Sequence, residues 1–291
     1  MHATRLLDRP IVTPDMHPDL ATNINGPSLI RAPDWLPGRL ARYYLYFAHH
    51  QGKYIRLALA DELAGPWRIH EGGALHLRQT LFNHHIASPD VHVDEERREL
   101  LMFFHGCAIP GRRFPWSQQT HLAVSTDGLA FTPVGDVVGP FYWRAFRYGD
   151  WWYALAMPGE FYRARALRDA VWELGPTRFT EHMRHSAVRL AGDTLHVFYS
   201  NATDCPECIL TCTVDLRADW HDWRPTDPVP LLTPERSWEG GDQPLEPSRR
   251  GSIHHAVRQL RDPAIYEEDG RTWLLYSVAG ESGIGLAELH G

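Results

Sequence analysis

The sequence has few cysteines and no long apolar segment. Its four cysteines include a single Cys-x-x-Cys pair, Cys205 and Cys208, followed by Cys212. A structural zinc knuckle needs a second such pair, so we predict free loop thiols and no bound metal. No apolar run is long enough to span a bilayer, and the first ten residues lack the apolar stretch of a signal peptide. We therefore expect a cytoplasmic protein with no membrane partner.

Basic clusters, linkers and low-complexity segments are also missing. The net charge is −7 and the chain has no basic block, which argues against nucleic acid as a partner. Hydrophobic residues make up 43% of the 291 residues, enough for the core of one large all-β domain. The least regular segment, residues 238–251, is long for a connection between strands. We interpret it as a functional loop.

The chain repeats one pattern of strands five times. Each copy has a short apolar strand, a tight turn, a second strand rich in aromatics and a third strand ending in small residues, as in residues 27–31, 43–48 and 54–60. A period of about 40–60 residues built from four short strands is typical of a propeller blade. We predict a single all-β domain over 1–291, a five-bladed β-propeller with blades at roughly 22–70, 84–135, 140–175, 183–232 and 255–290. A β-sandwich or two small β domains are the alternatives.

Three short phrases resemble the five-bladed glycoside hydrolases. Ala87-Ser-Pro-Asp-Val91, Gly65-Pro-Trp67 and Arg261-Asp-Pro-Ala-Ile265 are similar to phrases of glycoside hydrolase family 43 and its fructosidase-like relatives. The resemblance implies a glycosidase with three carboxylates: a base Asp in blade one, a modulating Asp in blade two and an acid Glu in blade three.

This sequence departs from that pattern in two blades. Only the blade-two residue carries over, onto Asp90. Gly26 stands where the base Asp would precede proline, and the blade-three strand from Trp143 begins without a Glu. The chain therefore resembles a divergent relative.

Inner strands of a propeller start near the same end of the axis, so polar residues at their starts are expected to converge on one funnel. Such a set suits a polyhydroxylated ligand. The candidate substrate-binding residues are Asn25, His50, His105, Arg144, His185 and Arg261. An arginine among them would suit a carboxylated or sulfated sugar, or pair with a buried Asp.

Glycoside cleavage by the usual route needs two carboxyl groups. Asp262 precedes Pro263 at a strand start, beside Arg261, and is our candidate for base or nucleophile. Asp90 is expected to orient the substrate or to tune the acid. Glu281, in a glycine-rich loop expected at the funnel mouth, is the candidate acid, ahead of Glu160 and Glu246.

Eighteen histidines are unusual, and three adjacent pairs lie near predicted strand ends: His49-His50, His84-His85 and His254-His255. One interpretation places them along the axis, where the resemblance implies that a histidine holds a central cation or water. Another makes one a general acid, and a multi-histidine metal site lacks diagnostic spacing. Adjacent residues of a strand point to opposite faces, so at most one of each pair is expected to face the funnel.

Together these observations predict a glycosidase that cleaves a short oligosaccharide with paired carboxylates and without a cofactor. Three alternatives stay open. They are a non-catalytic carbohydrate-binding propeller, a metal- or histidine-dependent lyase, and a sugar phosphorylase that would use Arg144 with Arg184.

Overall fold

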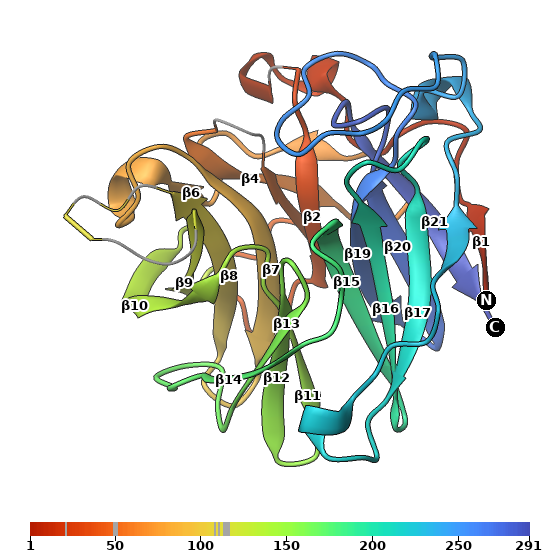
Figure 1. The fold of residues 1–291 in the computed structure, drawn as a ribbon. Coiled ribbons are helices and arrows are strands. Elements are labelled where there is room, and N and C mark those ends of the chain that lie inside the picture. Colours follow the sequence, from red (N-terminus) through yellow and green to blue (C-terminus); the bar gives the residue numbers. More distant parts are fainter. Residues whose placement is uncertain (21, 49–51, 108, 110, 113–116) are drawn as a thin grey trace.

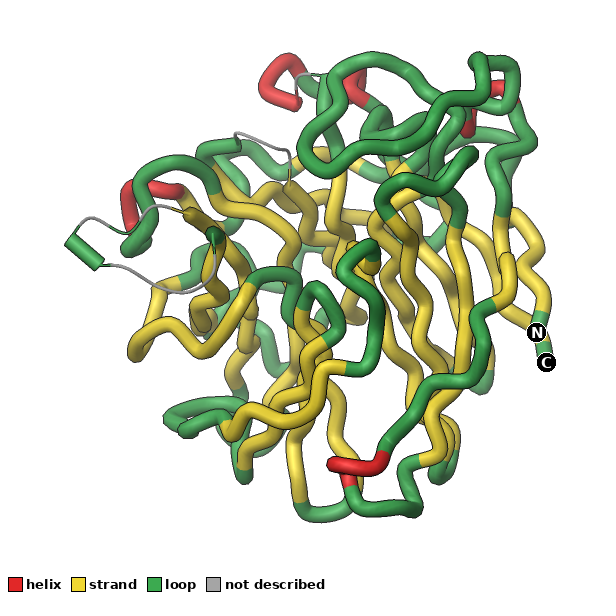
Figure 2. The backbone as a smooth tube through the Cα atoms, viewed as in Figure 1, coloured by secondary structure: helices red, strands yellow, loops and turns green. Residues whose placement is uncertain are grey.

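The computed structural model describes residues 1–20, 22–48, 52–107, 109, 111–112 and 117–291. Within these ranges the regular structure is almost entirely β-strand, and the helical segments are 3₁₀ turns of three residues (Figure 2). The strands form five sheets around a central axis (Figure 1), which confirms the predicted five-bladed β-propeller. No described helix has the length and apolar character needed to cross a membrane.

Each blade is an antiparallel sheet whose first strand lies nearest the axis. Blade one contains β2 (Asn25–Arg31), β3 (Tyr43–Ala48), β4 (Tyr54–Ala60), β5 (Arg68–Ile69) and β6 (Leu75–His76). Blade two contains β7 (Ile86–Asp94), β8 (Glu99–Cys107), β9 (Gln118–Ser125) and β10 (Thr132–Pro140). Blade three contains β11 (Arg144–Tyr148), β12 (Trp151–Ala156), β13 (Glu160–Ala164) and β14 (Glu173–Thr177). Blade four contains β15 (Met183–Ala191), β16 (Thr194–Asn201), β17 (Ile209–Asp215) and β18 (Val229–Leu232).

The fifth blade joins the two ends of the chain. It contains β19 (Arg261–Glu268), β20 (Arg271–Ser277) and β21 (Ile284–His290), and its outer strand is β1 (His2–Arg5). β1 pairs antiparallel with β21, with Ala3 opposite Leu289, so the termini lie side by side (Figure 1). The sequence interpretation began this blade at residue 255 and did not include β1. A four-residue strand of mixed burial carries too weak a signal to reveal its distant partner.

The core lies between the blades. Alternate residues of β3 face opposite neighbours: Tyr44 and Tyr46 pack in one apolar cluster with blade two, while Leu45 and Phe47 pack in another with blade five. The alternation of side chains along a strand therefore gives each blade apolar residues on both of its faces. Because both faces are buried, the middle strands read as continuous apolar runs such as residues 43–48.

Four of the five inner strands begin with the same one-residue bulge, and in blade three the equivalent offset lies just before β11, where the Met157 N–H donates to the Phe141 carbonyl. In blade two, for example, three steps from Ala87 to Asp90 match two steps from His105 to Phe103 on β8. The extra residue adopts the left-handed conformation in every blade, with φ between 47° and 59°; these residues are Gly26, Ser88, Tyr142, His185 and Asp262. Such bulges redirect a side chain and are frequent beside functional sites. Here they turn one residue of each blade towards the same end of the axis.

Candidate functional site

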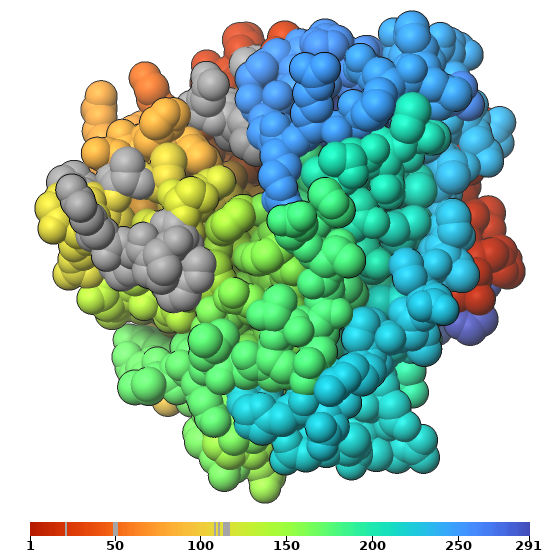
Figure 3. Space-filling view, viewed as in Figure 1, coloured from red at the N-terminus to blue at the C-terminus, as the bar shows by residue number. Residues whose placement is uncertain are grey.

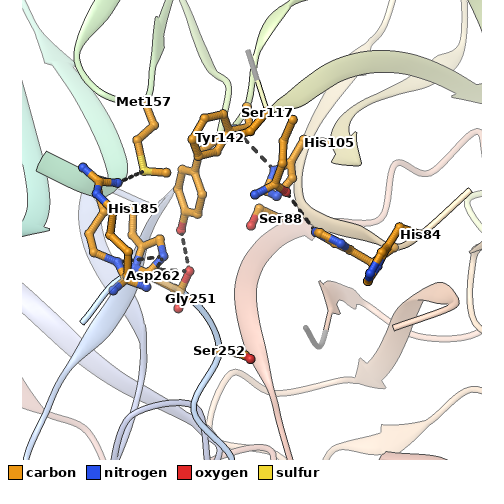
Figure 4. Close-up of a pocket in the computed structure, with 15 residues that line it drawn as sticks. His84, Ser88, His105, Ser117, Tyr142, Met157, His185, Gly251, Ser252 and Asp262 are labelled. Atoms are coloured by element: carbon orange, nitrogen blue, oxygen red, sulfur yellow. Dashed lines mark hydrogen bonds and ion pairs between the residues drawn. The ribbon is translucent and has the colours of Figure 1, made fainter. Parts of the chain in front are cut away.

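The bulge residues form the floor of a pocket at one end of the axis. The pocket has a volume of about 380 Å³, which falls within the range of small-molecule sites. Four of the five bulge residues line it, and Figure 4 shows Tyr142 between Asp262 and His185 on one side and Ser88 and His105 on the other. The remaining lining residues are His84, His85, Ser117, Gln118, Phe141, Met157, Arg184, Arg250, Gly251 and Ser252.

Asp262 is the acidic group of this pocket, and only 1% of the residue is exposed. Its Oδ1 accepts a hydrogen bond from the Tyr142 hydroxyl at 3.0 Å and lies 3.7 Å from Nδ1 of His185. Burial, with the adjacent Asp262 carboxylate, raises the pKa of Tyr142 well above its usual range, so this hydroxyl stays a donor. These neighbours suit an ionised carboxylate at the base of the pocket.

His185 is fixed in one tautomer by its neighbour. Nε and Nη2 of Arg184 lie 3.2 and 3.0 Å from its Nε2. A guanidinium only donates, so Nε2 accepts and the ring proton resides on Nδ1, the nitrogen that faces Asp262. Burial lowers the pKa of Arg184, and the nearby Glu207 carboxylate opposes that effect. His185 is therefore a neutral donor directed at Asp262.

The opposite wall of the pocket is built from blade two. His105 accepts a hydrogen bond on Nδ1 from the Tyr142 backbone N–H at 3.3 Å. His85 donates from Nε2 to Oε1 of Gln118 at 2.9 Å, and its Nδ1 lies 3.5 Å from the Cys107 sulfur. Burial raises the pKa of the Cys107 thiol, which keeps the S–H available to His85. His105 is thus neutral in its hydrogen bond, and His85 is neutral when the thiol donates to it.

The expectation that only one member of each histidine pair faces the funnel is wrong for His84 and His85. Both line the pocket. They precede β7, which begins at Ile86, so the alternation of a strand does not apply to them. His254 and His255 lie in a loop and are exposed, and His49 is outside the described residues.

Asp90 and Arg144 lie in a second layer, away from this pocket. They follow the bulge residues of their blades by two positions and line a separate axial cavity of about 200 Å³. The Arg144 guanidinium stacks on the Tyr142 ring at 4.4 Å and donates to the Pro89 and Ser186 carbonyls. Arg144 therefore supports the pocket floor from behind, and the structure does not bring it to the predicted substrate surface.

Asp90 binds two neighbours within the protein. Its Oδ2 accepts from Nε2 of His92 at 2.8 Å and from the Ala145 backbone N–H at 2.9 Å. Burial alone raises the pKa of Asp90, but His92, Arg144 and the Ala145 N–H outweigh burial and hold the pKa below its usual value. The carboxylate thereby links blades two and three.

Glu281 and Arg261 belong to a buried ionic cluster beside the pocket. Arg261 donates to Oε1 of Glu281 at 3.1 Å and lies 3.0 Å from Oε2 of Glu207. Glu281 also accepts from the Asn23 amide and is 1% exposed. Burial lowers the pKa of Arg261, but Glu207 and Glu281 outweigh burial and raise it. Glu281 was expected at the funnel mouth; the structure buries it because it neutralises Arg261.

The structure does not place the other predicted residues in the pocket lining. Asn25 is buried and donates to Asn23 at 2.8 Å, outside the pocket lining. His50 lies outside the described residues. Glu160 accepts from the Tyr162 hydroxyl, and Glu246 is exposed on the long loop. Of the nine predicted site residues, the structure brings Asp262, His105 and His185 together in the pocket.

Sequence reasoning missed Tyr142, whereas the segment 238–251, interpreted as a functional loop, does bring residues to the pocket. The segment after β18 lies across the upper part of the molecule (Figure 3) and brings Arg250, Gly251 and Ser252 to the pocket. Tyr142 could have been found by aligning Tyr142-Trp-Arg144 with Ser88-Pro-Asp90. In this alignment Arg144 is equivalent to Asp90 and Tyr142 to the bulge residue Ser88. The signal is weak because Trp143 replaces the proline that marks this position in three other blades.

The pocket offers one carboxylate where the usual glycosidase route needs two. Asp262 is the only Asp or Glu among the described residues that line it. The residues outside the described ranges, namely 21, 49–51, 108, 110 and 113–116, include no Asp or Glu. An Asp side chain does not fit at the position of Gly26, because its Cβ would lie 2.8 Å from the Ser88 Cα.

Comparison with known proteins gives one relative by sequence and many by fold. No family model matches the chain. It is 33% identical over 306 residues to uncharacterized protein R118 of Acanthamoeba polyphaga mimivirus, with 92% of this chain and 83% of that protein covered.

The solved structures that match are distant in sequence. One is CoXyl43, a family 43 β-xylosidase/α-arabinofuranosidase from a compost microbial metagenome in complex with xylotriose, with a TM-score of 0.65, 12% identity, and 99% and 95% of the two chains covered. Another is an exo-β-1,3-galactanase of Phanerochaete chrysosporium, with a TM-score of 0.63, 10% identity, and 91% and 59% covered. These matches confirm the resemblance to family 43 in fold.

Proposed function

We propose that this chain, which belongs to the same family as mimivirus protein R118, is a carbohydrate-processing enzyme that acts on a glycoside through the single pocket carboxylate of Asp262. The observation that carries the proposal is the placement of Asp262. It is buried in one wall of a sugar-sized pocket, next to the donors Tyr142 and His185. The glycosidase fold of the matching structures supports the same substrate class.

The pocket suits a sugar because its polar groups come from all sides. Ser88, Gln118 and Ser252 supply hydroxyl and amide groups, and Phe141 and Tyr142 supply apolar ring surface. Polar groups orient the hydroxyls of a sugar, while aromatic rings contact its C–H faces. Figure 4 shows the labelled side chains on opposite sides of the space that a ligand would enter.

Asp262 would act as the base in this scheme. Its carboxylate removes a proton from water while the water oxygen bonds to the anomeric carbon. The bond from that carbon to the leaving group breaks as the new bond forms, and the leaving group departs with the electron pair. The paired carboxylates predicted from the sequence are not needed for this step, provided that the leaving group is stable as an anion.

Among the described residues that line the pocket, no buried side chain is a strong acid, and this defines the leaving group of the proposed substrate. His105 and His185 each accept a hydrogen bond on one ring nitrogen, and His85 does the same when the Cys107 S–H is the donor, so we take all three as neutral imidazoles. A neutral imidazole is too weak an acid to protonate an alkoxide as it leaves. We therefore infer a glycoside whose leaving group is stable as an anion, such as a phenolate, a carboxylate or a phosphate.

The test is hydrolysis of a series of glycosides that differ only in the leaving group. We expect kcat/KM to fall steeply from dinitrophenyl to nitrophenyl to phenyl to methyl glycosides. Asp262→Asn should lower the rate on the dinitrophenyl substrate by about 10²–10⁴-fold. Asp193→Asn, an exposed Asp in the turn between β15 and β16, is the matched control and should leave the rate unchanged.

A non-catalytic sugar-binding protein is the second candidate, favoured by Gly26 and the single carboxylate. It predicts no turnover of the dinitrophenyl glycosides but a higher melting temperature in the presence of a sugar. A rate that is independent of the leaving group, or equal in wild type and Asp262→Asn, would refute the catalytic proposal.

A further inference from the structure

The histidine wall of the pocket contains a group of metal-binding side chains that the proposed chemistry does not use. One ligand atom each of His84, His85 and Cys107 lies within 4.8 Å of the others. His84 and His85 come from the loop before β7, and Cys107 ends β8 on the same blade. Two of the three line the pocket, so the group is open to a ligand on one side.

The best-placed pair already has the spacing of two ligands on one ion. Nδ1 of His85 and Sγ of Cys107 are 3.5 Å apart. Zinc takes nitrogen at about 2.0–2.1 Å and sulfur at about 2.3 Å, which at a tetrahedral angle places the two atoms about 3.5–3.6 Å apart. A bound ion would replace the proton between these two atoms.

His85 is also held as metal-binding histidines usually are. Its other ring nitrogen donates to Oε1 of Gln118 at 2.9 Å, which leaves the lone pair on Nδ1 directed at Cys107. A second hydrogen bond of this kind sets the tautomer and orientation of a ligating ring. His84 is exposed, and its ring lies 5.6 Å from that of His85, so a side-chain rotation can complete the set.

We propose that His84, His85 and Cys107 form a zinc site on the pocket wall, with its fourth position open to the ligand. Two imidazoles and a thiolate match zinc or a similar borderline transition metal, whereas calcium and magnesium prefer oxygen ligands absent from this set. Three protein ligands and one open position are the pattern of a zinc ion that binds substrate or water.

This inference goes beyond the proposed function and does not rest on it. Figure 4 shows His84 on the side of the pocket away from Asp262, so a ligand oxygen on the metal would face the carboxylate across the pocket. The sequence alone predicts no metal here, because β7 and nearly all of β8 separate His84-His85 from Cys107 and the three residues form no spacing motif.

The test is a cobalt and zinc titration of protein without a polyhistidine tag. The protein is first dialysed against a chelator, and Co²⁺ is then added as a spectroscopic substitute for zinc. We expect one ion per chain, a near-ultraviolet thiolate-to-cobalt charge-transfer band, visible bands of a tetrahedral ion, and loss of all of them when zinc is added.

Variants separate this site from adventitious binding. Cys107→Ser should abolish the charge-transfer band, and His84→Asn, an exposed change that leaves the fold intact, should weaken binding at least about tenfold. Cys205→Ser removes an exposed cysteine elsewhere and should change nothing. The proposal is overturned if wild type shows no thiolate band, or if the Cys107→Ser and His84→Asn proteins bind as wild type does.

Discussion

At the scale of single residues, one backbone position decides what each blade presents to the pocket. The left-handed bulge residue is Gly, Ser, Tyr, His or Asp in the five blades. Left-handed geometry is costly for residues other than glycine, and its repetition in four such residues marks the ring as a candidate functional site. A side chain at this position enters the pocket, whereas one two positions later, such as Asp90, enters the second axial cavity.

Gly26 is the member of this ring that cannot carry a side chain. We expect Gly26→Ala to destabilise the fold, because its Cβ would lie 2.8 Å from the Ser88 Cα in addition to the strain of a φ of +57°. Gly149→Ala is the control, since Gly149 has the same φ and nothing within 4 Å of its Cβ position. In urea unfolding, the free energy of unfolding should fall by about 1–3 kcal/mol more in Gly26→Ala than in Gly149→Ala, because of overpacking. Equal losses in the two variants would show that the contact with Ser88 is relieved cheaply.

At the scale of strands, the carboxylates outside the pocket hold neighbouring elements together. Asp90 joins β7 to β11 through the Ala145 N–H, and Glu281 joins the loop before β21 to β19 through Arg261. Both were candidate catalytic groups from the sequence. Their contacts predict effects on stability that a catalytic role alone would not produce.

Asp90 should make the fold sensitive to acid. Its pKa in the folded protein is below its ordinary value of 3.8, so its contribution is complete above that value and is lost as the pH falls through the folded pKa. Wild type should therefore lose melting temperature as the pH falls below about 4, and Asp90→Asn should lose less over the same range. Parallel melting curves of the two proteins across this range would contradict the account.

Glu281→Gln should destabilise the protein more than it affects catalysis. The change leaves Arg261, which is 1% exposed, with Glu207 as its remaining carboxylate partner in the cluster. Breaking a buried ion pair lowers the free energy of unfolding by about 3 kcal/mol, which urea unfolding can measure. Glu246→Gln, on the exposed loop, is the control. Loss of turnover on a phenyl glycoside with unchanged stability would instead identify Glu281 as the acid.

The strands were easier to predict than the site because their signal is local. Aromatic runs such as residues 43–48 and the turns between strands identify blades directly. The pocket depends on a bulge that shifts each strand start by one residue, and the sequence does not display that shift. In the sequence, Asp262 and Asp90 both look like axial carboxylates beside a proline. Asp262 is the bulge residue of blade five, however, whereas Asp90 lies two positions after Ser88, the bulge residue of blade two. Tyr142 was missed for the same reason.

At the scale of the whole molecule, the strand that closes the propeller is connected to the segment that lines the pocket. β1 completes the last blade, and Arg5 at its end binds the buried Glu239 through two hydrogen bonds of 2.7 and 2.8 Å. Glu239 opens the long segment that continues to Arg250 and Ser252 in the pocket wall. Ring closure and the pocket rim are therefore parts of one connected structure.

The central claim is that a sugar binds at the bulge ring, against Asp262. The most direct measurement is a crystal structure of the Asp262→Asn protein with the least reactive glycoside that still raises the melting temperature of wild type. The account predicts a sugar ring between residue 262 and His105, with its anomeric carbon towards residue 262. A sugar bound elsewhere, with this pocket filled only by solvent, would contradict it.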